Sequence, residues 1–147
     1  GARLIVTIDV GEAGDIHPRD KLTVGLRLAE AARSSAAQAL MPVDIGEPTV
    51  DRDGVIMLKL GSDPVVAPRN GEAPMPFVAC AQTRGTCREI VVSLAGNVLR
   101  FDPLRPDEDS IRYCWAENTK CNLFNVYGNP LTPFEIFIKK PNWHANQ

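Results

Sequence analysis

The chain has 147 residues, of which 44% are hydrophobic and 23% charged, and its formal net charge is −2. This balance is typical of a soluble globular protein with room for one core. Because no basic run exceeds Lys139–Lys140 and no apolar run approaches the roughly 18 residues that span a bilayer, neither nucleic acid nor membrane is expected as a partner.

The first forty residues have the order strand, polar loop, helix. A continuous apolar, β-branched run over Leu4–Val10 predicts a strand buried on both faces, as in a parallel α/β sheet. Glycines and a proline predict a loop over 11–18. The helix is predicted from about Asp20, a suitable N-cap, to about Leu40, before Pro42. In open α/β sheets, catalytic groups gather on the loops that follow strands.

From Val43 onward the pattern is β-rich, because short apolar runs alternate with turn signals such as Asn70-Gly71. The sequence therefore predicts an α/β unit followed by a sandwich-like β domain. The predicted strands are Val50–Asp51, Val55–Leu60, Pro76–Ala81, Glu89–Leu94, Val98–Phe101, Ile111–Trp115, Leu123–Val126 and Phe134–Ile138.

The four cysteines form two local pairs, Cys80/Cys87 and Cys114/Cys121. Zinc sites usually have tighter spacings such as CxxC, and the two histidines of this chain lie far apart in sequence. We therefore predict one disulfide in each local pair, no metal site, and an oxidising compartment. Four reduced thiols in a cytosolic protein are the alternative.

Asp15-Ile-His-Pro18 is the segment with catalytic character. A histidine can take a proton from a hydroxyl nucleophile and return it to the leaving alcohol. It needs a carboxylate to orient it, and side chains two apart in extended chain point to the same side, which would bring Asp15 near the His17 ring. Taken alone, such a pair is more often solvated or capping than catalytic. His144 has no comparable context.

The segment from Thr7 to Leu28 resembles the last conserved block of the sialate O-acetylesterases, which are members of the SGNH-type esterase group. The shared pattern is a strand ending in an acidic glycine turn, then Asp-Ile-His-Pro, then a lysine and Gly-x-Arg-Leu on the helix. A second match, in the family's order, follows about a hundred residues later. It comprises Ile111–Trp115, Cys121–Asn125 and Gly128–Phe134.

The resemblance implies ester hydrolysis by a serine nucleophile with a His/Asp pair. His17 would be the general base and Asp15 its orienting partner. The wider SGNH pattern places the acid three residues before the histidine, and that position is Gly14 here. Glu12 and Asp9 are therefore alternative partners for His17.

For domain organisation, the resemblance implies that residues 1–41 end an SGNH-type hydrolase domain and that residues 42–147 form a β-rich carboxy-terminal domain. The family's nucleophile lies in a Gly-x-Ser-like block, and nothing in this sequence matches it. We therefore expect the nucleophile on an amino-terminal segment or chain of the same precursor. This chain alone is expected to be inactive.

The resemblance further implies removal of O-acetyl groups from sialic acids, or from a related acetylated glycan, by a secreted or lysosomal protein without metal or organic cofactor. Arg19, Lys21 and Arg27 flank the histidine loop as candidate contacts for a sialic acid carboxylate, although solvated helix residues are the commoner case. The rival hypothesis is a non-catalytic β-sandwich module that binds glycans or a partner protein. Trp115 and Trp143 are candidate sugar-stacking residues.

Overall fold

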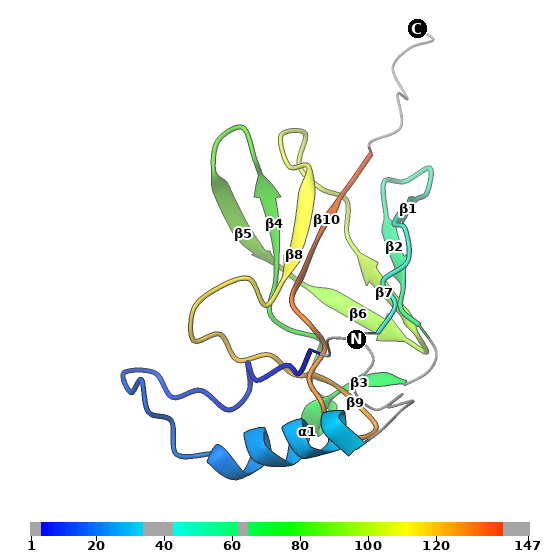
Figure 1. The fold of residues 1–147 in the computed structure, drawn as a ribbon. Helices are drawn as coiled ribbons and strands as arrows, with labels where there is room; N and C mark the ends of the chain where they lie inside the picture. The colour runs from blue at the N-terminus through cyan, green and yellow to red at the C-terminus, as the bar shows by residue number, and fades with distance from the viewer. Residues whose placement is uncertain (1–3, 34–42, 62–64, 140–147) are drawn as a thin grey trace, which may run out of the picture.

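The computed structural model describes residues 4–33, 43–61 and 65–139 (Figure 1). These residues form one helix, ten short strands and a single 3-10 turn at Arg69–Gly71. No helix among them is long and apolar enough to cross a membrane. The elements are α1 Lys21–Arg33, β1 Thr49–Val50, β2 Ile56–Lys59, β3 Val66–Pro68, β4 Phe77–Ala81, β5 Thr86–Ile90, β6 Val92–Ala95, β7 Val98–Phe101, β8 Ser110–Tyr113, β9 Leu123–Asn125 and β10 Phe134–Phe137.

The strands form three sheets, and every named strand pairing among the described residues is antiparallel. One four-stranded sheet has the order β1-β2-β7-β6, a second has the order β10-β8-β4-β5, and β3 pairs with β9. In Figure 1 the two larger sheets lie together, with α1 below them next to β3 and β9. The loop before α1 projects to one side, away from the strands.

The chain passes from one large sheet to the other at Val91. We predicted a single strand over Glu89–Leu94, but β5 ends at Ile90 and β6 begins at Val92, in different sheets. Val91 itself is 81% exposed. A corner where a strand changes sheets is a common device for closing two antiparallel sheets over one core.

The core joins residues from all three sheets around Phe77. The Phe77 ring packs edge-on against Phe101 of the other large sheet, with ring centroids 5.3 Å apart. It also contacts Tyr113 at 4.8 Å between centroids, and such aromatic pairs stabilise beyond the area that they bury. Burial raises the pKa of the Tyr113 hydroxyl, which accepts the backbone N–H of Leu123 in β9. The third sheet is thereby tied to the same core.

The predicted α/β unit is wrong. Among the described residues, Leu4–Val10 forms no strand and no parallel pairing, and the structure is β-rich with one short helix. The Val10 N–H closes a turn onto the Thr7 carbonyl at 3.2 Å, and Leu4 is 64% exposed. The backbone groups of a strand need hydrogen bonds to a neighbouring strand, and no described strand pairs with this segment.

Other boundaries follow the predictions closely. Asp20 is the N-cap, because its Oδ1 accepts the Thr23 N–H at 2.9 Å. That hydrogen bond holds the pKa of Asp20 below its usual value. The described part of the helix ends at Arg33, and the predicted continuation over 34–40 lies outside the described residues, as does the division between residues 41 and 42. That division stays a prediction.

Both predicted disulfides are present. Cys80 and Cys87 are direct partners in the register of β4 and β5. Cys114, just after β8, pairs with Cys121, just before β9. Disulfides fit an oxidising compartment, as predicted.

Glu108 should make the fold sensitive to acid. Its carboxylate is buried and accepts two hydrogen bonds from Arg88, at 2.6 and 2.9 Å. Burial alone would raise the pKa of Glu108, but the hydrogen bonds from Arg88 and the Arg105 backbone hold it below its usual value of 4.5. The folded state therefore binds the Glu108 proton less readily than the unfolded state. This contribution to stability is present above about pH 4.5 and is lost as pH falls through the folded pKa.

We expect the free energy of urea unfolding to fall between pH 6 and pH 3, and to fall less in Glu108→Gln, which is also less stable at pH 6. Glu89→Gln, which changes an exposed carboxylate on β5 next to Arg88 in sequence, is the matched control for loss of one charge. Equal pH dependence in wild type and Glu108→Gln would contradict this account.

Candidate active site

The histidine loop, residues 11–20, is built on a tight turn. The Asp15 N–H donates to the Glu12 carbonyl at 3.3 Å, and Gly14 has a φ of +87°, in the left-handed region that glycine adopts readily. The Glu12 carboxylate then accepts the Arg19 backbone N–H at 2.8 Å. The loop thus has internal hydrogen bonds on both sides of His17, and its backbone shape is defined by the sequence itself.

Asp15 and His17 are joined through the backbone. Asp15 Oδ1 accepts the His17 N–H at 2.7 Å, as an aspartate does in an Asx turn. Both side chains are exposed, and Ile16 between them is 91% exposed. Among the described residues the His17 imidazole makes no hydrogen bond. The structure brings the two predicted residues together, while the ring contact that catalysis would need stays a prediction.

Arg27 lies inside the protein, contrary to the expectation of a solvated helix residue. Its guanidinium forms a two-pronged ion pair with Asp9, at 2.6 and 2.8 Å, and it also donates to the Val6 carbonyl at 2.8 Å. The side chains of Arg27 and Asp9 are 7% and 10% exposed. Arg27 therefore holds the segment before the loop onto α1, and it is not free to bind a ligand carboxylate.

The same guanidinium reaches the β sheets. Arg27 Nη2 donates to the Gly128 carbonyl at 3.3 Å, and Arg69 Nη2 donates to the same carbonyl at 3.5 Å. Arg69 also stacks over the Phe124 ring, 3.4 Å from its centroid. We call Asp9, Arg27 and the Gly128 carbonyl the Arg27 cluster. It positions α1 and the histidine loop relative to β9.

Two asparagines of the second segment that resembles the family, within Cys121–Asn125, make structural hydrogen bonds. Asn125 Oδ1 accepts the N–H groups of Tyr127 and Asn129, both at 3.0 Å, and so shapes the turn that presents the Gly128 carbonyl to Arg27. Asn122 bonds the Met75 N–H and the Ala73 carbonyl through its side chain. Asn125 therefore supports the Arg27 cluster, and Asn122 holds the segment before β4 against the residues that precede β9.

These contacts distinguish the three candidate acids. Both oxygens of Asp9 are engaged by Arg27, and Glu12 is engaged by Arg19. Asp15 is the acid whose carboxylate already contacts His17, through its backbone. Asp15 therefore remains the orienting partner that we predict.

The described serines lie on strands of the two large sheets, outside the histidine loop. Ser110, in β8, is fully buried, and its Oγ donates to Glu135 at 3.0 Å. Ser93 lies in the middle of β6. Ser34, Ser35 and Ser62 lie outside the described residues. The prediction that the nucleophile is supplied by another segment stays a prediction.

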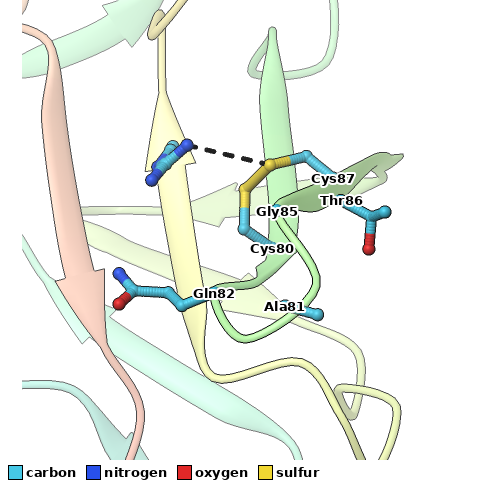
Figure 2. A pocket seen from close by; sticks show the side chains of 7 residues that line it. Cys80, Ala81, Gln82, Gly85, Thr86 and Cys87 are labelled. Atoms are coloured by element: carbon cyan, nitrogen blue, oxygen red, sulfur yellow. Dashed lines mark hydrogen bonds between the residues drawn. A yellow bond between two sulfur atoms is a disulfide. The ribbon is translucent and has the colours of Figure 1, made fainter.

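A separate depression lies beside the first disulfide (Figure 2). It has a volume of about 280 Å³ and contains no residue of the histidine loop. Arg112, on its wall, is held by Glu135 at 2.8 Å and donates to the Cys87 sulfur at 3.8 Å. The lining residues are Cys80, Ala81, Gln82, Gly85, Thr86, Cys87 and Arg112.

Among the aromatic candidates, Trp115 is 53% exposed, and the Arg112 guanidinium lies 5.7 Å from its ring centroid. Trp143 lies outside the described residues. No group of three or more His, Cys, Asp or Glu in the described part of the chain is arranged to hold a metal ion.

The described residues thus form a β-rich domain. It is preceded in the chain by the helix α1, and an exposed turn with Asp15 and His17 lies just before that helix. Its structure is similar to that of a carbohydrate acetylesterase from Xanthomonas citri, with a TM-score of 0.74 and 27% sequence identity. The match covers 95% of this chain but 32% of that chain, so this chain spans about a third of the neighbour's length. No protein-family profile matches the sequence, and no curated protein matches it.

That likeness supports the relationship to carbohydrate esterases expected from the sequence. Membership of the sialate O-acetylesterases and the identity of the reacting residues stay predictions.

Proposed function

We propose that this chain is the carboxy-terminal part of a serine-type carbohydrate esterase that removes O-acetyl groups from sialic acids or a related acetylated glycan. The observation that carries the proposal is the internally hydrogen-bonded loop that presents His17 next to Asp15. The similarity to a carbohydrate acetylesterase supports the same reaction class. A secreted or lysosomal location agrees with the two disulfides.

In this proposal His17 is the general base. Its imidazole takes the proton from a serine hydroxyl as that oxygen attacks the acetyl carbonyl, and it returns the proton to the departing sugar oxygen. Asp15 Oδ1 fixes the backbone of His17, so Oδ2 is the atom to accept the ring Nδ1–H and stabilise the imidazolium. The serine nucleophile belongs to an amino-terminal segment or chain of the same precursor.

The first expected result is that residues 1–147 alone do not hydrolyse an acetyl ester above background. The reason is that a base without its nucleophile keeps little catalytic power. The measurement is release of acetate from an O-acetylated sialic acid, with and without the upstream polypeptide of the precursor. Stoichiometric labelling of a serine of this chain by an active-site serine reagent would overturn the proposal.

A non-catalytic glycan-binding module is the second candidate, and the exposed ring of Trp115 beside Arg112 favours it. Aromatic faces with a nearby polar group are suited to sugar rings. Under this alternative, Trp115→Ala abolishes glycan binding while His17→Ala has no effect.

A further inference from the structure

We propose that the outer face of α1 is the surface that binds the polypeptide carrying the nucleophile. This α1 outer face comprises Leu22, Gly25, Leu26 and Ala29, which are all exposed. Leu22 is 73% and Leu26 61% exposed. The identity of the partner rests on the proposed function. The existence of the apolar surface does not.

The outward side of α1 is more apolar than that of an ordinary surface helix. A surface helix normally buries its apolar face and exposes its polar one. Here the inward side buries Arg27, at 6% exposure, together with Ala31, while leucines face outward. Positions 22, 25, 26 and 29 recur at helical spacing, so they form one continuous apolar stripe. Such a stripe indicates a surface that is covered in the assembled protein.

Gly25 gives an independent indication. A glycine inside a helix costs roughly 1 kcal/mol relative to alanine, so its presence calls for a reason. A Cβ added at Gly25 would meet nothing within 4 Å, and its φ is not in the left-handed region. Nothing within the described chain therefore requires glycine. Close approach of another backbone to the outer face would account for the glycine.

The occupant follows from the position of the face and the length of the related enzyme. The similar acetylesterase chain has about two thirds of its length outside the matched part. The α1 outer face begins five residues after His17, directly next to the loop that needs a nucleophile from elsewhere. A polypeptide docked there would bring its serine to the exposed imidazole. The partner is therefore the upstream part of the same precursor, with a complementary apolar surface.

The test uses the 147-residue chain and the upstream polypeptide of its precursor, which are coexpressed, copurified and then separated. Their Kd is measured by calorimetry as one is titrated into the other. We expect Leu22→Glu with Leu26→Glu to raise the Kd at least 30-fold, as for loss of an interface hot spot. We expect Gly25→Gln to raise it at least tenfold and, in the isolated chain, to raise the thermal midpoint. If Gly25 were needed only for the structure of the isolated chain, Gly25→Gln would lower that midpoint.

Val91→Glu is the matched control, because Val91 is also apolar and is even more exposed, at 81%, but lies at the corner between β5 and β6. It should leave the Kd unchanged. Unchanged binding by the outer-face variants, absence of binding by wild type, or a wild-type dimer that Leu22→Glu with Leu26→Glu dissociates would each overturn the inference. Because the assay measures binding, a complex that forms through this face without esterase activity would refute the proposed function and support the docking surface.

Discussion

Replacement of Arg27 by methionine is expected to lower the free energy of unfolding by about 3–5 kcal/mol, because it leaves the Asp9 carboxylate buried without its partner. The ion pair is two-pronged and nearly inaccessible to solvent. The same variant frees the carbonyls of Val6 and Gly128 from their donor. The measurements are urea unfolding at pH 7 and hydrogen exchange of the α1 amides.

A double variant separates the charge from the packing. Asp9→Leu combined with Arg27→Met removes both charges, and such replacements are often close to neutral; we expect it to recover most of the lost stability. Arg33→Met, at the exposed end of α1, is the control for loss of a helix arginine. A destabilisation of Arg27→Met no larger than that of Arg33→Met would show that the cluster does not hold the segment.

The burial of Arg27 was not predictable from local pattern, because its partners come from distant parts of the chain. Asp9 lies 18 residues before it and Gly128 lies 101 residues after it. The family resemblance placed Arg27 in a Gly-x-Arg-Leu segment, which was the available signal. In this structure that arginine is a buried ion-pair residue and not a ligand contact.

The β region shows which features local sequence can predict. Alternating apolar residues and turn signals predicted β4, β7, β8 and β10 within a residue or two. β3 was missed, because three residues ending in Pro68 carry little pattern. Sheet membership could not be predicted, since pairing depends on contacts remote in sequence. The corner at Val91 is the clearest case, because apolar residues continue through it unbroken.

The error at Leu4–Val10 has a related cause. An apolar, β-branched run shows that a segment favours extended chain, but a strand also needs a partner strand. The described residues supply none to this segment. For the candidate site, the contact between Asp15 and the His17 ring stays a prediction. The structure adds the supports of the loop: the turn at Gly14, the bond from Arg19 to Glu12, and the Arg27 cluster.

In the assembled enzyme, His17→Ala is expected to reduce turnover by several orders of magnitude, because it removes the proposed group that carries the proton. Asp15→Asn should reduce turnover substantially but less, because asparagine still accepts the His17 N–H and preserves the loop while withdrawing the charge that stabilises the imidazolium. Substrate affinity should change little in both, since these groups act on the transition state. The measurements are kcat and KM for an O-acetylated sialic acid.

Glu12→Gln is the control for the choice of acid, because glutamine can still accept the Arg19 N–H and keep the loop closed. If Asp15 orients His17, Glu12→Gln retains nearly full turnover. If instead Glu12→Gln is severely impaired and Asp15→Asn is not, the acid lies on the glycine turn and Asp15 serves only the backbone of His17. Turnover close to wild type in His17→Ala would remove the hydrolytic role of this loop altogether. The exposed ring of Trp115 would then be the better guide to function, and the chain would be a glycan-binding module.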